Sequence, residues 1–230
     1  MELSDVETAV FILIKEYLKK NRVFNVKNII PWIVQSLSSY NLDPPLNEAG
    51  VEKILWHFIR ERIVIPGSKL TKEKLLENYS RKSIYNHVFK NPGTHLREIM
   101  NKLELGAHAT LWHINLLIKF GYVRFTAIGK YKTFFVSSLP DTLDKEIFYL
   151  GNATINEIIQ LMVVNGEGLT INRISEELGI HYNTANKSMH ILNELGLLLQ
   201  TEDENQVNYI LNRDKFSEII SGIDTLRTSQ

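Results

Sequence analysis

Hydrophobic positions between residues 94 and 135 follow a helical period and then a strand period. Three- and four-residue spacing connects two sets of apolar positions: Leu96, Ile99 and Leu103, then Thr110, Ile114 and Leu117. From Tyr122 to Phe135 the period changes to two, around Ile128-Gly129-Lys130. The pattern predicts two helices joined by a tight turn and followed by a β-hairpin.

The same pattern recurs further along the chain. Placing Gly121 over Gly196 aligns LREIMNKLELGAHATLWHINLLIKFGYV with INRISEELGIHYNTANKSMHILNELGLL without a gap, and their apolar positions coincide. We call this alignment the repeat register. A preceding helix is predicted in both copies, opening at Asn78 and at Asn152, each followed two residues later by Ser80 or Thr154, residue types suited to helix N-caps. A fainter third copy lies near the start of the chain and ends at Pro66-Gly67-Ser68, where a hairpin is expected.

Three helices with a helix-turn-helix core and a C-terminal hairpin make a winged helix. The sequence therefore predicts a mainly α fold with small β-hairpins (α+β), built from three tandem winged-helix units. The predicted segments are an N-terminal unit with a degenerate wing (1–68), a central basic unit (69–138), an acidic third unit (139–212) and an amphipathic tail helix (213–230). The tail places Phe216, Ile219, Ile220 and Ile223 on one helical face, to be covered either by this chain or by a second copy.

Charge is unevenly distributed, although the chain of 230 residues has a formal net charge of zero. Residues 69–138 contain twelve Lys and Arg but four Asp and Glu, a net charge of +8, whereas residues 139–230 carry −8. A segment this basic is typical of a phosphate-binding module. Cysteine is absent, which excludes thiolate zinc sites and disulfides, and no apolar run reaches the roughly 18 to 20 residues of a membrane span. A cytoplasmic protein is expected.

The central unit resembles the ArsR-like winged helix-turn-helix regulators abundant in archaea. The resemblance rests on an Asn-Pro-Gly phrase before the second helix (residues 91–93) and on a closing phrase formed by His113, Ile114, Leu117 and Gly121. Residues 78–136 match well, and residues 153–200 match as a more generic copy. The resemblance implies double-stranded DNA as the partner, a homodimer, and transcription regulation as the role.

Carrying over the family's groove-facing positions, and adding nearby cations, gives the candidate DNA-binding residues of the central unit: His95, Arg97, His108, Trp112, His113, Asn115, Lys119, Arg124, Lys130, Tyr131 and Lys132. The third unit offers secondary candidates: Tyr182, Asn183, Asn186 and Lys187. Asn and Lys suit base edges better than Leu111 and Trp112 do, but the third hairpin contains Glu202, Asp203 and Glu204, which would repel phosphates. The central unit is therefore predicted to be the main phosphate-contacting unit.

Several of these residues have a second interpretation. Trp112 and Leu111 either contact the groove or pack against another part of the protein. Lys130 and Lys132 either contact phosphates or only protect a sheet edge. The histidines His95, His108 and His113 lack the spacing of a metal site; they either contact phosphates or bases, or serve only in packing or capping. No phosphate-binding glycine loop, serine elbow or acid–base cluster appears. No catalytic residue, metal or cofactor is predicted, and the sequence indicates neither an effector nor an operator.

Two functions follow from these patterns. The first is a DNA-binding transcription regulator that reads the duplex with a winged-helix recognition helix and a basic wing. The alternative is a tandem winged-helix scaffold for protein interactions, resembling ESCRT-II-type subunits. The neutral total charge, the acidic third hairpin and the apolar Leu111 and Trp112 favour the scaffold.

Overall fold

The computed structural model describes residues 3–21, 23–37, 40, 46–203 and 206–228. The chain forms two compact units: unit 1 contains residues 1–87 and 99–124, and unit 2 contains residues 88–98 and 125–230. Each unit is described below by itself.

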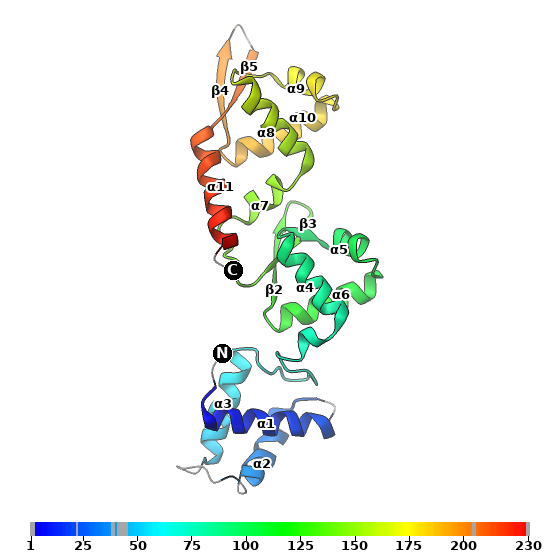
Figure 1. The fold of residues 1–230 in the computed structure, drawn as a ribbon, viewed down its shortest axis with the longest axis vertical. Coiled ribbons are helices and arrows are strands. Elements are labelled where there is room, and N and C mark those ends of the chain that lie inside the picture. Colours follow the sequence, from blue (N-terminus) through cyan, green and yellow to red (C-terminus); the bar gives the residue numbers. More distant parts are fainter. Residues whose placement is uncertain (1–2, 22, 38–39, 41–45, 204–205, 229–230) are drawn as a thin grey trace. The chain divides into compact units, whose positions relative to one another are not determined.

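The described chain is mainly helical, with small antiparallel sheets (Figure 1). Its helices are α1 (Asp5–Lys20), α2 (Val26–Leu37), α3 (Glu48–Arg60), the 3-10 helix η1 (Leu75–Glu77), α4 (Tyr79–Lys90), α5 (Leu96–Leu103), α6 (Ala107–Lys119), α7 (Asp144–Leu150), α8 (Ala153–Asn165), α9 (Ile171–Glu177), α10 (Tyr182–Glu194) and α11 (Arg213–Thr228). Its strands are β1 (Thr94–His95), β2 (Val123–Ile128), β3 (Tyr131–Val136), β4 (Leu198–Asp203) and β5 (Gln206–Leu211). The predicted α+β class is confirmed at this level.

The sequence repeat is visible in the bounds of the elements. In the repeat register, α6 and α10 begin and end at equivalent positions, and so do β2 and β4, and β3 and β5. Asn78 and Asn152 accept backbone hydrogen bonds from Arg81 and Ile155, as N-caps of α4 and α8 do. The chain thus folds the two aligned stretches into the same order of helices and strands.

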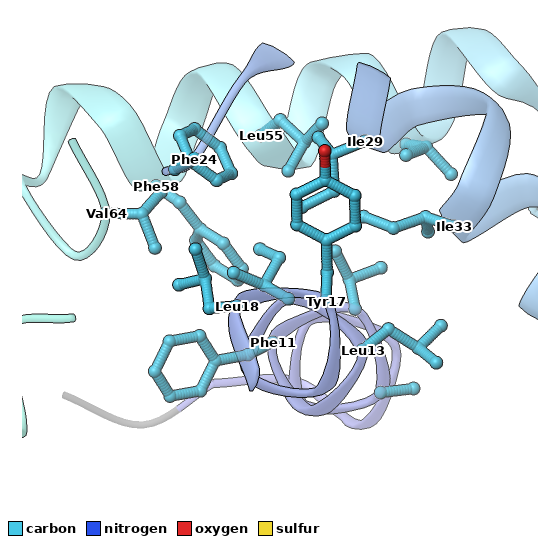
Figure 2. Packing of buried hydrophobic residues seen from close by; sticks show 14 of the residues in the cluster. Phe11, Leu13, Tyr17, Leu18, Phe24, Ile29, Ile33, Leu55, Phe58 and Val64 are labelled. Atoms are coloured by element: carbon cyan, nitrogen blue, oxygen red, sulfur yellow. The ribbon is translucent and has the colours of Figure 1, made fainter. Parts of the chain in front are cut away.

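The N-terminal part of unit 1 is a three-helix core (Figure 2). Ser4 and Glu7 form a capping box that starts α1, and Asn47 caps α3. Edge contacts join Phe11 to Phe58 at 5.9 Å between ring centroids, and side chains from all three helices are buried between them. Each such apolar side chain contributes about 1.5–3 kcal/mol when it leaves water.

After α3 the chain makes one isolated bridge, between Val64 and Thr71, where the first unit was predicted to have a degenerate wing. Hydrogen bonds from Phe24 N to Ser68 O and from Gly67 N to Phe24 O attach this segment to the residues before α2. Gly67 has a φ of +79°, which favours glycine. Residues 64–71 are therefore an ordered part of the N-terminal core.

Further along unit 1, the end of α6 contacts residues that follow α3. The Arg62 guanidinium donates to the carbonyl oxygen of Ile118 at 3.3 Å, and the Tyr122 hydroxyl donates to the Lys72 carbonyl oxygen at 3.1 Å. Arg62 has a φ of 57°, in the left-handed region, a conformation that costs of order 1 kcal/mol or more in a residue other than glycine. These contacts join α6 to the N-terminal core.

Unit 2 contains the three-stranded sheet, in the order β1-β3-β2, with Thr94 opposite Phe134 and His95 opposite Thr133. Gly129 has a φ of +56° and, with Lys130, forms the two-residue connection between β2 and β3, as the sequence predicted. Asp144, at the start of α7, is buried and accepts a hydrogen bond from Thr126 Oγ1. This bond fixes the hairpin to α7.

The rest of unit 2 is formed by α8 to α11 and the β4–β5 hairpin. Leu198 lies opposite Leu211, and a bridge pairs Leu169 with Tyr209. Along α11, Ile219 and Ile223 are buried by other residues of this chain. At these two positions the apolar face of the tail helix therefore needs no second copy to cover it.

The contact-based units do not coincide with the repeat, because α6 belongs to unit 1 and β3 to unit 2. The division at residues 68, 138 and 212 stays a prediction drawn from the repeat.

Candidate nucleic-acid interface

Helix α6 has one buried side and one exposed side. Thr110, Ile114 and Leu117 are fully buried, and the Thr110 hydroxyl donates back to the Gly106 carbonyl oxygen at 2.9 Å. We call the opposite side the α6 outer face; it consists of the exposed residues His108, Leu111, Trp112, Asn115 and Lys119. Because these residues recur at three- and four-residue spacing, they form one stripe.

Trp112 is 56% exposed yet held in place. The Arg81 guanidinium lies over its ring at 5.8 Å from the centroid, and the His113 ring meets it edge-on at 4.8 Å. Arg81 is itself buried and donates through Nε to the Leu75 carbonyl oxygen at 2.7 Å. Burial lowers the pKa of Arg81. Trp112 therefore packs against Arg81 and His113 on one side, while more than half of its surface stays exposed to solvent.

His113 was predicted to face the groove, but it is buried, with 9% of its surface exposed. Burial lowers the pKa of this imidazole, and the nearby Arg81 charge lowers it further. Its Nδ1 has no hydrogen-bond partner among the described residues. Its position three residues after the buried Thr110 explains its inward orientation. We therefore leave His113 out of the interface.

In unit 2, the tip of the β2–β3 hairpin combines exposed cations with aromatic rings. The Lys132 ammonium lies 3.9 Å from the centroid of the Phe125 ring, and the Lys130 ammonium lies 5.4 Å from that of Tyr131. Phe125 and Tyr131 are themselves exposed, at 49% and 41%. A cation above an aromatic face gains about 0.5–1 kcal/mol at exposed sites, so these contacts restrict the lysines without neutralising them.

His95 supports the hairpin tip from β1. Its ring stacks on Tyr131 with centroids 5.2 Å apart and planes 17° apart. His95 Nδ1 accepts a hydrogen bond from the Glu98 backbone at 3.1 Å, so the neutral ring carries its proton on Nε2. His95 thus caps the first turn of α5 and orients Tyr131.

The two predicted arginines lie in different settings. Arg97 is exposed on α5, whereas Arg124 is half-buried on β2 and has an interaction partner. Arg97 is thus open to solvent, and Arg124 is engaged within the protein.

Helix α10 presents the secondary candidates. Tyr182, Asn183, Asn186 and Lys187 are all exposed, and the His181 Nδ1 caps the helix by accepting from the Asn183 backbone at 3.1 Å. The following hairpin starts with β4, which includes Glu202 and Asp203, while Glu204 lies outside the described residues. The exposed side of α10 is mainly polar, whereas the α6 outer face also includes the apolar side chains of Leu111 and Trp112.

Unit 2 contains a cleft of about 1090 Å³ that brings members of both candidate sets together. His95, Lys130 and Tyr131 line it from the sheet, and Asn183 and Lys187 line it from α10. Aromatic Phe148 and Tyr149 of α7 also line it. The sequence offered the central and third units as alternative DNA-binding units, but in the structure residues of both candidate sets line the same cleft.

Three residues that contact the candidate DNA-binding residues or line the cleft beside them were not predicted from the sequence. Arg81 orients Trp112, Phe125 lies under Lys132, and Lys90 lines the cleft. The placement of Phe125 in an alternating run that ends in a lysine-bearing turn was a usable signal. Arg81 gave a signal only through its spacing, since it precedes the buried Ile84 by three residues and the buried Val88 by seven.

The described residues contain no cluster of three His, Asp or Glu side chains that would suit a metal ion. Within the same residues, no single helix combines the length and apolar character of a membrane span. Helices α7 and α8 pass that test only as a pair, and they are bent by 83° at their junction.

Comparison with known proteins gives one informative similarity. No family model matches the chain. A stretch of 155 residues, 67% of this chain, is 28% identical to an uncharacterised HTH-type transcriptional regulator of Methanocaldococcus jannaschii. The match covers 38% of that protein, so the chain spans well under half of its relative's length. The chain is therefore similar to part of an archaeal protein named for a helix-turn-helix.

Proposed function

We propose that this chain is a DNA-binding transcription regulator whose repeated segments are tandem winged helices. The observation that carries the proposal is the repetition of two helices and a hairpin, first as α5–α6–β2–β3 and then as α9–α10–β4–β5. A helix-turn-helix places its second helix in the major groove, and a following hairpin reaches the backbone. Helix α6 is the proposed reading helix, and α10 is its counterpart.

The hairpin tip provides the proposed phosphate contacts. Lys130 and Lys132 are exposed, and both ammonium groups are positioned over aromatic rings. The sequence has no acidic residue between Glu104 and Asp141, so no carboxylate close in sequence offsets them. Counterion release from the duplex then favours binding, with an affinity that falls as salt rises.

The α6 outer face provides the proposed groove contacts. Asn115 has the amide that pairs with an adenine edge, and Trp112 and Leu111 offer apolar surface to a thymine methyl group. Because Arg81 already orients the indole of Trp112, little side-chain freedom remains to be lost on binding.

The archaeal relative supports a regulator only at the coarse level of its name. The ArsR-like subclass and the homodimer are further parts of this proposal. A homodimer would double the phosphate contacts and match an operator with two half-sites. Multi-angle light scattering of the full chain tests it: a mass near that of one chain, 26.6 kDa, over the micromolar range would rule the dimer out.

A fluorescence anisotropy titration with a labelled duplex tests DNA binding. The wild type is expected to bind at about 50 mM salt and to weaken steeply by about 200 mM. Replacing Lys130 and Lys132 by Glu is expected to lower the affinity at least about tenfold. In a plot of the logarithm of the binding constant against the logarithm of the salt concentration, the loss of two phosphate contacts makes the slope shallower by about 1.8.

The matched control carries the same change of charge elsewhere. Lys53→Glu with Lys145→Glu alters two exposed lysines of α3 and α7 that lie outside the proposed interface. An equal loss in this variant, or no salt-dependent binding by the wild type, would contradict the proposal.

One observation favours the interaction scaffold as a second candidate function. Leu111 and Trp112, at 42% and 56% exposure, form an apolar strip on α6 that suits a protein partner. A pull-down with the full chain separates the two functions. A stoichiometric partner that is lost in Trp112→Ala and kept in the Lys130→Glu/Lys132→Glu variant would support the scaffold and count against DNA reading by α6.

A further inference from the structure

The cleft of about 1090 Å³ in unit 2 is bounded by elements that pack closely around α7. Gly93 precedes β1 and approaches α7 so closely that a β-carbon there would lie 3.3 Å from the Phe148 Cα atom. Gly222 of α11 approaches the start of the same helix, where a β-carbon would lie 2.9 Å from Leu143 Cδ1. The β1 turn and α11 are therefore both held against α7, and the cleft between these elements is preformed.

A continuous row of four aromatic rings forms one wall of this cleft. His95 stacks on Tyr131 with centroids 5.2 Å apart, and Tyr131 meets Phe148 at 5.8 Å. Phe148 in turn meets Tyr149 at 5.1 Å. Tyr131 keeps 41% of its surface exposed, whereas rings that only fill a core are buried. We call the four residues the aromatic wall; it leaves ring surface open to a planar ligand.

Helix α10 contributes polar groups to the cleft. Thr184, Ser188 and Ile191 line it at four- and three-residue spacing, so they form one stripe along the helix. Ser188 is only 7% exposed. Among the described residues its hydroxyl has no hydrogen-bond partner, yet it is not one of the polar atoms sealed from solvent. Most buried hydroxyls are hydrogen-bonded, so a hydroxyl left open at the wall of a cleft suits a ligand that supplies the partner.

Positive charge lies beside the aromatic wall. The Lys130 ammonium is 5.4 Å from the centroid of the Tyr131 ring, which places it next to a ring that lines the cleft. Three lysines and two carboxylates line the cleft: Lys90, Lys130, Lys187, Glu98 and Asp224. Asp224 already interacts within the chain. The surroundings of the aromatic wall therefore favour an anionic group over a cationic one.

We propose that this cleft binds a nucleotide-like ligand, that is, a flat heteroaromatic ring that carries an anionic group. The ring would stack on the aromatic wall at Tyr131, its polar edge would meet the Ser188 hydroxyl, and the anionic group would lie near Lys130. Small-molecule sites have volumes of about 300–1,000 Å³ and combine aromatic and aliphatic side chains with a few polar groups, as this cleft does. An inorganic anion would leave the aromatic wall without a role.

A base of single-stranded nucleic acid offers the same chemistry from another source. Duplex DNA does not, because its bases are stacked on one another. A groove that follows a strand is positively charged along its length. This cleft is lined by carboxylates as well as lysines, so the free nucleotide is favoured.

Isothermal titration of the full chain with adenosine monophosphate (AMP), at low salt and without DNA, tests the proposal. Saturable binding with one site per chain is expected. Tyr131→Ala is expected to weaken the affinity about tenfold, because base–aromatic stacking is lost. Lys130→Gln and Ser188→Ala are each expected to weaken it several-fold, because each removes one hydrogen-bond donor.

The same hairpin supplies matched controls. Phe125 and Lys132 are an exposed aromatic residue and an exposed lysine that do not line the cleft, so Phe125→Ala and Lys132→Gln are expected to keep the wild-type affinity for AMP. Thermal unfolding of each variant shows whether the fold is kept; if Tyr131→Ala unfolds, the Lys130 and Ser188 variants decide. No saturable binding by the wild type, or equal weakening in the controls, overturns the proposal.

Two fragments of the probe separate the contributions of its parts. Adenosine lacks the phosphate, and ribose 5-phosphate lacks the base, so both are expected to bind several-fold more weakly than AMP. Ribose 5-phosphate binding as tightly as AMP would remove the role of the aromatic wall and overturn the proposal. Adenosine binding as tightly as AMP would overturn the anionic part of the ligand.

A competition experiment separates the two sources of the base. If a short single-stranded oligonucleotide of deoxyadenylate displaces AMP with an affinity more than about a hundredfold higher, and Tyr131→Ala loses that affinity, the cleft takes a base of a strand and the free-nucleotide proposal is wrong. Weaker displacement, or none, supports the free nucleotide. No step uses duplex DNA, so failure of α6 to bind a duplex leaves these readouts unchanged and the two proposals are judged separately.

Discussion

The segments α5–α6–β2–β3 and α9–α10–β4–β5 have the same order of elements in the repeat register but differ in surface chemistry. The first has Leu111 and Trp112 on the α6 outer face and a hairpin tip with two lysines, whereas the second has a polar α10 and a hairpin whose sequence is acidic at Glu202 and Asp203. The comparison teaches that buried positions preserve a fold while exposed positions are free to change its partner. It also predicts which substitutions should act alike in the two copies and which should not.

The largest expected effect tests the shared part. Ile114 and Met189 are equivalent in the repeat, and both are almost completely buried. Truncation to Ala is expected to destabilise the protein by about 2–5 kcal/mol in either case, because each change leaves a cavity in the core beneath its helix. Urea unfolding followed by circular dichroism measures both. A loss at one site alone, with the other variant as stable as the wild type, would show that the two cores are not equivalent.

A smaller effect tests the part that differs. Asn115 on α6 and Asn186 on α10 are both exposed, so the same substitution to Ala is made on each helix. On a duplex selected from a random pool, Asn115→Ala is expected to lower affinity about tenfold or more, the value of a bidentate base contact. Asn186→Ala is expected to change it less than about threefold. The reverse order would make α10 the reading helix.

The smallest expected effect is a pH dependence that only the first copy has. Burial and the Arg81 charge lower the pKa of His113 below its usual 6.5, so the unfolded chain binds a proton more readily than the folded one. Stability from this residue is complete above pH 6.5 and declines as pH falls toward the lowered folded pKa.

The repeat supplies the control for this effect. Its equivalent position is the buried Ser188, so His113→Ser gives the first copy the residue of the second. The variant is expected to lose less stability than the wild type between pH 7.5 and 5.5, in paired urea titrations. An equal loss in both proteins would assign the pH dependence to other groups.

Much of the secondary structure followed from the sequence because apolar periodicity records which side of each element is buried. The repeat register, the asparagine caps and the turn at Gly129 and Lys130 all depend on neighbours close along the chain. His113 shows where this reasoning failed: a resemblance assigned it to the groove, although its spacing from Thr110 and Leu117 already fitted the buried side.

Contacts between distant segments were beyond the sequence. Nothing in the runs around Lys15 and Lys69 indicates that they share a pocket, and Asn183 and Lys130 are far apart along the chain although they line one cleft. Counting charges gave the net charge of the basic segment, but it did not distinguish the buried side chain of Arg81 from the exposed side chain of Lys132. Such distinctions depend on tertiary packing rather than on composition.

Arg62 has a practical consequence for dissecting this protein. Its guanidinium donates to the carbonyl oxygen of Ile118 in the last turn of α6, in addition to the backbone N–H of Gly121, and its positive charge lies at the negative end of the helix dipole. Gly121 leaves room for it, since a β-carbon there would come within 3.0 Å of the arginine side chain. A fragment starting at residue 69 would lose this hydrogen bond at the end of α6, so truncations should retain the residues that follow α3.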